Sequence, residues 1–387
     1  MTWALTPLTE EQRAIQTVAR EFAAAEIAPY SDRWDRDAYF EPSLVGKLGE
    51  LGFLGMMIPE RYDGMGLDTL TYLVALEEIA IVDASVAVML SVHNSLPTQM
   101  LLRWGTENQR ERFLKPMARG ELLGAFALSE PEAGSDAASL RTQAVRDGGD
   151  WTLNGTKAWV SSGTTGEVIL AMARTDGPDD RRGARGISAF IVTPDLPGFS
   201  VGKKEDKMGL RASPTVQIHF SDLRVPGDRL LGDEGRGFIY AMQSLDNGRL
   251  GIAAQAVGIA EAALRASAAY AAERKQFGKP IKEFQAIQFK LADMATRVSS
   301  SRALLHAAAT AKDRGERITQ FSSMAKLQAS EAAMWVTTQA IQIFGGYGYV
   351  KEYPVERLFR DAKVTEIYEG TSEIQRIVIA RELYSHT

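Results

Sequence analysis

Cysteine is absent from the 387-residue chain, and histidine occurs only four times, at His93, His219, His306 and His386. Without thiols the chain can form no disulfide, zinc–thiolate site, iron–sulfur cluster or cysteine nucleophile. The histidines lie far apart and none belongs to an HExxH pair, so we expect no metal site. Any demanding chemistry must therefore depend on carboxylates, hydroxyls, the main chain or a cofactor.

An excess of positive charge and long apolar runs are also missing. The 44 basic side chains are outnumbered by 49 acidic ones, and this balance favours neither a nucleic acid nor a membrane surface as a partner. No stretch approaches the roughly 20 apolar residues of a membrane-spanning helix. The first residues have neither secretory nor transit-peptide character, so we expect a cytoplasmic protein.

Nucleotide-binding fingerprints are incomplete in this chain. Gly-x-Gly pairs begin at Gly64, Gly235 and Gly346, but none has the third glycine of the dinucleotide motif. The sequence also lacks a Walker lysine motif and a G-x-S-x-G elbow. These absences exclude a Rossmann domain, a P-loop enzyme and an α/β-hydrolase.

Proline, glycine and hydrophobic periodicity divide the chain into three regions, at 1–120, 121–230 and 231–387. The first and third carry helical spacing, which predicts an N-terminal helical domain and a C-terminal four-helix bundle. The middle region has short apolar runs and strict alternation over Val216–Phe220, which predict an antiparallel β domain built as a barrel or sandwich. Within the first region we expect one long helix over Leu67–Val92. Thr9 and Thr106 each precede a glutamine by three residues, which predicts a capping box at the start of two other helices.

Two segments at the start of the β region offer groups that suit a planar, phosphorylated ligand. The first, 126–136, contains two hydroxyls and Gly134, which lets a ligand approach the main chain. In the second, 157–161, Trp159 and Ser161 lie two residues apart on a strand and so share a face. Taken singly, an ordinary turn and a tryptophan in the hydrophobic core explain these segments equally well.

Two further segments lie in the helical C-terminal region. Arg274 to Pro280, with Gln285 beyond, falls at a break between helices and suits a phosphate or a neighbouring subunit, although a solvated turn capped by Gly278 is the simpler alternative. Glu369 stands beside a glycine in an apolar setting, where desolvation would raise its pKa towards that of a working base. The competing explanation is a glutamate that complements the helix predicted to begin at Ser372.

Together these segments resemble the acyl-CoA dehydrogenase family of flavoproteins over nearly the whole chain. The order FALSEP-x-AGSD, WVS, R-x-QFG-x-P, QIFGGYG and IYEGTSEIQR is highly specific. The resemblance implies FAD between the β domain and the bundle, a homotetramer with shared cofactor sites, and electron-transfer flavoprotein as the acceptor. It assigns FAD contacts to Phe126, Leu128, Ser129, Gly134, Ser135, Trp159, Val160, Ser161, Arg274, Gln276, Phe277, Gln285, Gln342, Ile343, Gly345, Gly346, Thr371 and Glu373, and acyl-CoA contacts to Ser135, Asp246, Arg249 and Gly370.

The reaction implied is the α,β-dehydrogenation of an acyl-CoA to the trans-2-enoyl-CoA. Glu369 removes the α-proton and flavin N5 accepts the β-hydride. Some branches of the family place the base within the stretch that corresponds to 244–250, but the matching residue here is Gly248, which favours Glu369. The segment 82–96 contains no Arg or Lys to pair with a dicarboxylic acyl group, so we expect a short- to medium-chain substrate, straight or branched.

Two alternatives remain at this stage. An acyl-CoA oxidase would use oxygen on the same fold, although oxidases of this shape are typically longer. A helical scaffold that has lost its flavin is less consistent with the joint presence of Glu369, Trp159, Ser161 and Arg274. A visible spectrum distinguishes the scaffold from the two enzymes, because a protein that has lost its flavin is colourless.

Overall fold

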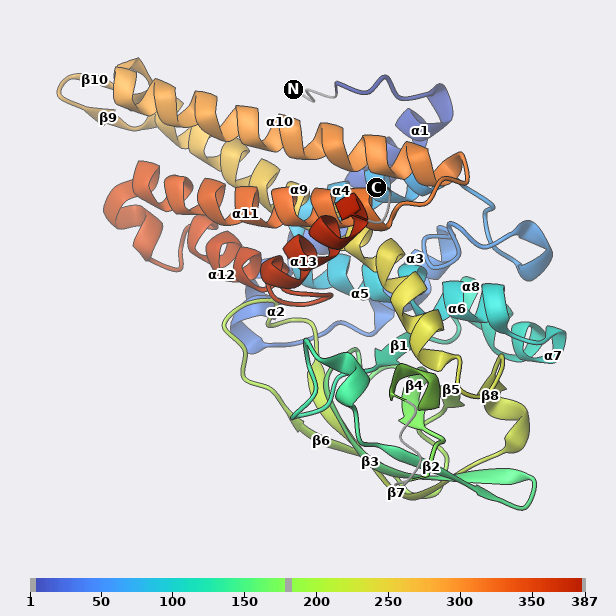
Figure 1. Ribbon diagram of the computed structural model, residues 1–387. Helices are drawn as coiled ribbons and strands as arrows, with labels where there is room; N and C mark the ends of the chain where they lie inside the picture. Colours follow the sequence, from blue (N-terminus) through green and yellow to red (C-terminus); the bar gives the residue numbers. More distant parts are fainter. Residues whose placement is uncertain (1–4, 178–182, 385–387) are drawn as a thin grey trace.

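A computed structural model describes residues 5–177 and 183–384. Two helical regions from opposite ends of the sequence lie together, and a β-sheet region projects from one side of them (Figure 1). The predicted α-β-α order is therefore confirmed. None of the helices in the described ranges is long and apolar enough to cross a membrane.

The N-terminal region begins with capped helices. Thr9 Oγ1 accepts a hydrogen bond from Gln12 N at 3.1 Å and Gln12 Oε1 accepts one from Thr9 N at 3.0 Å, which closes a capping box. Thr106 and Gln109 repeat this arrangement, as the sequence predicts. The region contains α1 (Glu10–Phe22), α2 (Ser31–Asp37), α3 (Ser43–Glu50), α4 (Thr69–Val82), α5 (Ala84–Ser95), α6 (Pro97–Trp104), α7 (Glu107–Gln109) and α8 (Lys115–Ala118).

The single helix expected over Leu67–Val92 is wrong, because the chain breaks at Asp83. This residue adopts an extended conformation, and its side chain accepts hydrogen bonds from the main-chain N–H groups of Ser85 and Val86. An aspartate that caps a new helix also ends the preceding one. Apolar residues continue on both sides of Asp83, so periodicity alone did not reveal the break.

The middle region forms one eight-stranded sheet. Its path is β6 (Phe199–Lys204), β7 (Thr215–Val225), β3 (Asp150–Ser161), β2 (Gln143–Asp147), β4 (Val168–Arg174), β5 (Ile187–Val192) and β8 (Leu230–Leu231), with β1 (Gly124–Ala127) paired to β4. Most neighbouring strands pair antiparallel, as expected, but β1 pairs with β4 in parallel, and β2 also pairs with β4 in parallel. The β2–β3 hairpin between β1 and β4 supplies the crossover that a parallel pair requires.

Strand β4 is apolar from Val168 to Ala173, and both of its faces are covered. Ile169, Ala171 and Ala173 join the sheet's own core, which also contains Trp151 and Phe190. Val168, Leu170 and Met172 point the other way, into a second cluster formed with α6, α8 and the start of the C-terminal region. The sheet is thus fixed against the helices through its central strands.

The C-terminal region is built on three long helices, α9 (Gly237–Glu273), α10 (Gln285–Asp313) and α11 (Thr319–Phe344), with α12 (Val355–Thr365) and α13 (Ser372–Tyr384) packed on α11. A short hairpin, β9 (Lys275–Gln276) and β10 (Lys279–Pro280), joins α9 to α10. Gly278 lies in the turn of this hairpin with φ +79° and is not a helix cap.

The two helical regions share one hydrophobic core. Helix α4 is buried along nearly its whole length and contacts α9 and α10 as well as α1 and α5. Buried Arg302 of α10 donates to Glu77 of α4 at 2.8 Å and to Glu261 of α9 at 3.0 Å. Helices separated by more than a hundred residues in the sequence are therefore held as one body, and the predicted site lies against it.

Candidate active site

Glu369 lies in the short connection between α12 and α13. Its φ of 52° is left-handed, and Gly370 follows with φ 92°. A non-glycine residue in this conformation costs about 1–2 kcal/mol, so the surrounding structure must impose it. The turn directs the carboxylate onto Gly248 of α9, where a Cβ atom would stand 2.0 Å from Glu369 Oε2.

The carboxylate of Glu369 is buried and unpaired. Both of its oxygens are shielded from solvent and neither has a hydrogen-bond partner among the described residues. This burial raises the pKa of Glu369 to about 7, against the opposing pull of the Lys326 and Arg249 cations. Such a group holds a proton at mildly acidic pH and can accept one at neutral pH, which is the requirement for a general base.

The main chain around Glu369 is held from two sides. Lys326 Nζ donates to the Gly370 carbonyl at 2.6 Å, and Gln375 Nε2 donates to the same oxygen at 2.9 Å and to the Glu369 carbonyl at 3.1 Å. The main-chain N–H of Glu369 donates to no group in the described ranges. Lys326 and Gln375 were not among the site residues predicted from the sequence. A lysine in the alanine-rich stretch 325–333 was the available signal for the first.

The residues predicted to hold acyl-CoA are brought together in part. Asp246 and Arg249 form a partly buried ion pair one turn apart on α9, and Thr319 Oγ1 donates to Asp246 at 2.8 Å. The charge of Arg249 acts on Glu369, so this pair lies beside the candidate base. Ser135 is on the exposed loop that follows β1.

A buried ion pair fixes that loop. Lys157 on β3 donates to Glu130 at 2.8 Å and to the Leu128 carbonyl at 3.2 Å, and Ala158 N donates to the Ser129 carbonyl at 2.9 Å. Glu130 also accepts from Thr142 N at 2.9 Å. The residues of this loop that are predicted to contact FAD are therefore held in place by an ion pair and hydrogen bonds.

The predicted contacts on this loop and strand differ in exposure. Gly134 and Ser135 are exposed, Phe126 and Ser129 are partly exposed, and Leu128 and Val160 are buried in hydrophobic clusters, where only their main chains could reach a ligand.

Trp159 does not enter the hydrophobic core. A register shift between Lys157 and Val160 in the β3–β7 pairing accompanies a φ of 60° at Trp159, whose side chain is 63% exposed. Ser161 is partly exposed and Val160 between them is buried, as expected for two residues on one face. An indole that is exposed at the surface in this way is available for stacking on a planar ligand.

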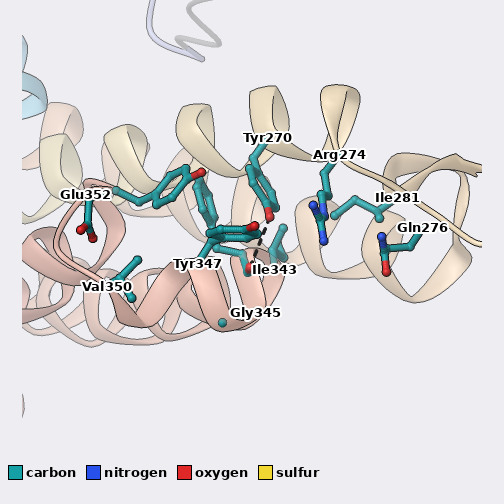
Figure 2. Close-up of a pocket in the computed structure, with 12 residues that line it drawn as sticks. Tyr270, Arg274, Gln276, Ile281, Ile343, Gly345, Tyr347, Val350 and Glu352 are labelled. Atoms are coloured by element: carbon teal, nitrogen blue, oxygen red, sulfur yellow. Dashed lines mark hydrogen bonds between the residues drawn. The ribbon is translucent and has the colours of Figure 1, made fainter.

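A second group of predicted residues lies at the far end of the bundle. Arg274, Gln276 and Ile343 line a pocket of about 780 Å³ (Figure 2). The Arg274 guanidinium lies 5.3 Å from the Tyr347 ring centre. Gly345 and Gly346 also line it. Phe277 is 94% exposed on the neighbouring hairpin, and Gln285 and Gln342 are exposed outside the pocket lining.

The start of α13 differs from the prediction. Thr371 Oγ1, not Ser372, accepts the capping hydrogen bond, from Ile374 N at 3.3 Å. Gln375 does not complete a capping box, because its side chain donates to the carbonyls of Glu369 and Gly370. Glu373 is exposed in the first turn, where its carboxylate complements the helix dipole.

Models of the acyl-CoA dehydrogenase N-terminal, middle and C-terminal domains match residues 9–121, 125–223 and 235–384. The chain is 48% identical to the mitochondrial short-chain specific acyl-CoA dehydrogenase of Bos taurus, over 97% of this chain and 90% of that one. Butyryl-CoA dehydrogenase from Megasphaera elsdenii superposes with a TM-score of 0.96 at 44% identity, covering 98% and 99% of the two chains.

A chain in a solved structure described as the electron transferring flavoprotein of Acidaminococcus fermentans matches with a TM-score of 0.95 at 46% identity, over 99% of both chains. These similarities in sequence and structure cover all three regions of the chain, including the β sheet and the helices that carry the candidate site. The chain therefore belongs to the acyl-CoA dehydrogenase family of flavin-dependent oxidoreductases.

Proposed function

We propose that this protein is a short-chain acyl-CoA dehydrogenase in which Glu369 is the catalytic base. The observation that carries the proposal is the buried carboxylate of Glu369, which has no hydrogen-bond partner in the described residues and a pKa raised to about 7. A structural glutamate at a helix start would be expected to pair with main-chain N–H groups and to have a lowered pKa. The similarity to butyryl-CoA and short-chain enzymes supports a short acyl group, straight or branched.

Glu369 would take the α-proton of the thioester onto a carboxylate oxygen. The unused main-chain N–H of Glu369 is available to the thioester oxygen, where negative charge develops as the proton leaves. The dry surroundings of the carboxylate strengthen both interactions and keep water from protonating the base. Glu369 thus accepts a proton while the adjacent peptide stabilises the charge left behind.

The residues present fit FAD as the cofactor. The indole of Trp159 is 63% exposed, and no atom lies within 4 Å of a Cβ built on Gly134, so a large planar group can approach both. Phe126, Ser129, Gly134, Ser135, Trp159 and Ser161 would hold it. When bound, FAD supplies the acceptor for the β-hydride, which leaves the trans-2-enoyl-CoA. The family's flavin dependence and the likeness to a chain in an electron transferring flavoprotein structure support electron-transfer flavoprotein as the partner.

The pocket at the far end of the bundle supports a shared cofactor site. Lys326 contacts the turn that carries Glu369, and Ile343 in the pocket follows it by 17 residues on α11. About 25 Å of helix therefore separates the pocket from that turn. We infer that Arg274, Gln276, Ile343, Gly345 and Gly346 serve the FAD of a neighbouring subunit in a homotetramer. The exposed ring of Phe277 is consistent with a subunit contact at this end. The cytoplasmic location stays a prediction.

The proposed function is tested by anaerobic titration of the purified flavoprotein with acyl-CoAs of increasing length, including isobutyryl-CoA and 2-methylbutyryl-CoA. We expect butyryl-CoA to bleach the flavin fastest, and Glu369→Gln to bind it without bleaching. Rapid reduction of the Glu369→Gln flavin would show that another group is the base. Gel filtration or light scattering of the same sample tests the tetramer.

A further inference from the structure

Lys326 is a buried charge that the proposed mechanism does not use. Its side chain is among the largest that are fully buried, and it lies on α11 within a run of small residues. Burying an ammonium group is costly unless hydrogen bonds or an opposite charge compensate it. Desolvation lowers the pKa of Lys326 to about 8, so the group remains largely protonated at neutral pH. A feature that costs stability in this way requires a reason.

The contacts of Lys326 are directed at the turn that carries Glu369. Its ammonium donates to the Gly370 carbonyl at 2.6 Å, an oxygen that Gln375 also contacts at 2.9 Å. No hydrogen bond joins Lys326 to the Glu369 carboxylate, whose oxygens have no partner in the described ranges. Lys326 therefore holds the peptide that follows the base and leaves the base itself free to accept a proton.

Two cations act on the Glu369 carboxylate, Lys326 and Arg249. Arg249 also faces the carboxylate, but Asp246 pairs with it directly. Of the cations that act on Glu369, Lys326 has the larger effect. The other titratable groups around the two side chains are Tyr72 of α4, Tyr368 beside the base, and the carboxylates of Glu366 and Glu373.

We propose that Lys326 is a positioning residue for the base: it fixes the Glu369–Gly370 peptide and supplies positive charge that favours the ionised form of the Glu369 carboxylate. This inference rests on the proposed role of Glu369. Without the charge of Lys326, the dry pocket would favour the protonated acid, which cannot accept the α-proton. The lysine thus allows the base to be both desolvated and ionised.

The test is the pH dependence of flavin reduction by butyryl-CoA in Lys326→Met, which removes the charge and keeps an unbranched side chain. Loss of a nearby opposite charge raises a carboxyl pKa, so the acid limb of the rate should move up by about one pH unit or more. The rate below pH 7 should fall about 10-fold for each pH unit by which the limb moves, while the rate on the alkaline plateau and the KM change much less. Lys326→Arg, which retains the cation, should restore the acid limb.

A readout independent of turnover is the infrared band of the protonated Glu369 carboxyl, identified by its absence in Glu369→Gln. In Lys326→Met this band should persist to higher pH than in the wild-type protein. Lys312→Met is the matched control, because Lys312 on α10 is also a desolvated lysine but its charge faces Asp313. It should leave both readouts unchanged. If Lys326→Met does not retain flavin, Lys326→Gln replaces it in both measurements.

The outcomes separate the inference from the function on which it rests. Rapid flavin reduction by Glu369→Gln overturns the role of Glu369 itself. If Glu369→Gln is inactive but the acid limb and the infrared band do not move in Lys326→Met, the proposed function stands and the role of Lys326 is wrong. A loss that is equal at every pH overturns the electrostatic role of Lys326, because it indicates that the residue only holds the turn.

Discussion

Replacing Gly248 by alanine should damage catalysis and leave the fold intact. The added Cβ would stand 2.0 Å from Oε2 of Glu369, whereas ordinary contacts begin at 3.4 Å, so the carboxylate must move by about 1.4 Å. The atom in conflict is the end of a flexible side chain, which can rotate away. A displacement of about 1 Å at a reacting group can cost about 100-fold in rate, and we expect a loss of that order.

Stopped-flow reduction of the flavin by butyryl-CoA measures this loss, and thermal unfolding measures the fold. Alanine is a better helix former than glycine by about 0.5–1 kcal/mol, so Gly248→Ala should not lower the unfolding temperature. Gly46→Ala on α3 is the matched control, because nothing lies within 4 Å of its added Cβ. A Gly248→Ala protein that reduces its flavin at close to the wild-type rate would refute the reasoning, because it would show that catalysis does not depend on the position of the Glu369 carboxylate against Gly248.

Three further predictions concern ionisation and packing. Flavin reduction should increase as the pH rises through about 7, because burial raises the pKa of Glu369 and only its ionised form is a base; a rate that stays the same across this range contradicts the assignment. Lys157→Met should reduce flavin retention on gel filtration and lower stability by about 3–5 kcal/mol, and adding Glu130→Gln should recover part of both. Gly258→Ala, whose Cβ would lie 2.6 Å from Ala80, should cost about 1–3 kcal/mol in urea unfolding without shifting the pH profile.

Local chemistry explains which elements could be predicted from the sequence. The capping boxes at Thr9 and Thr106 and the alternation over Val216–Phe220 depend on neighbours in the chain, and the structure contains all three. The break at Asp83 was missed because a cap within a continuous apolar run does not alter hydrophobic periodicity. Parallel pairing of β1 with β4 depends on the path of the chain, which short patterns do not encode.

The candidate site was predictable to a similar extent. Glu369 was identified from its motif and from its apolar neighbours, and the structure adds that its carboxylate is buried and unpaired among the described residues. Lys326 and Gln375 were missed because their importance arises only when α11 and α13 meet at the turn. Likewise, the closeness of Gly248 to Glu369 joins positions 121 residues apart, and no local pattern connects them.

The shared core of the two helical regions has a consequence for synthesis. Helix α4 packs against α9 more extensively than against any other helix and also contacts α10; these two helices begin at residues 237 and 285, so the ribosome produces α4 long before them. During that interval the apolar side chains of α4 that these helices cover have no partner. Glu77, on the same helix, also lacks its partner Arg302, which has not yet been synthesised. The core of the N-terminal region is therefore completed only after α9 and α10 have been made, and until then the apolar surface of α4 that these helices cover is exposed to aggregation.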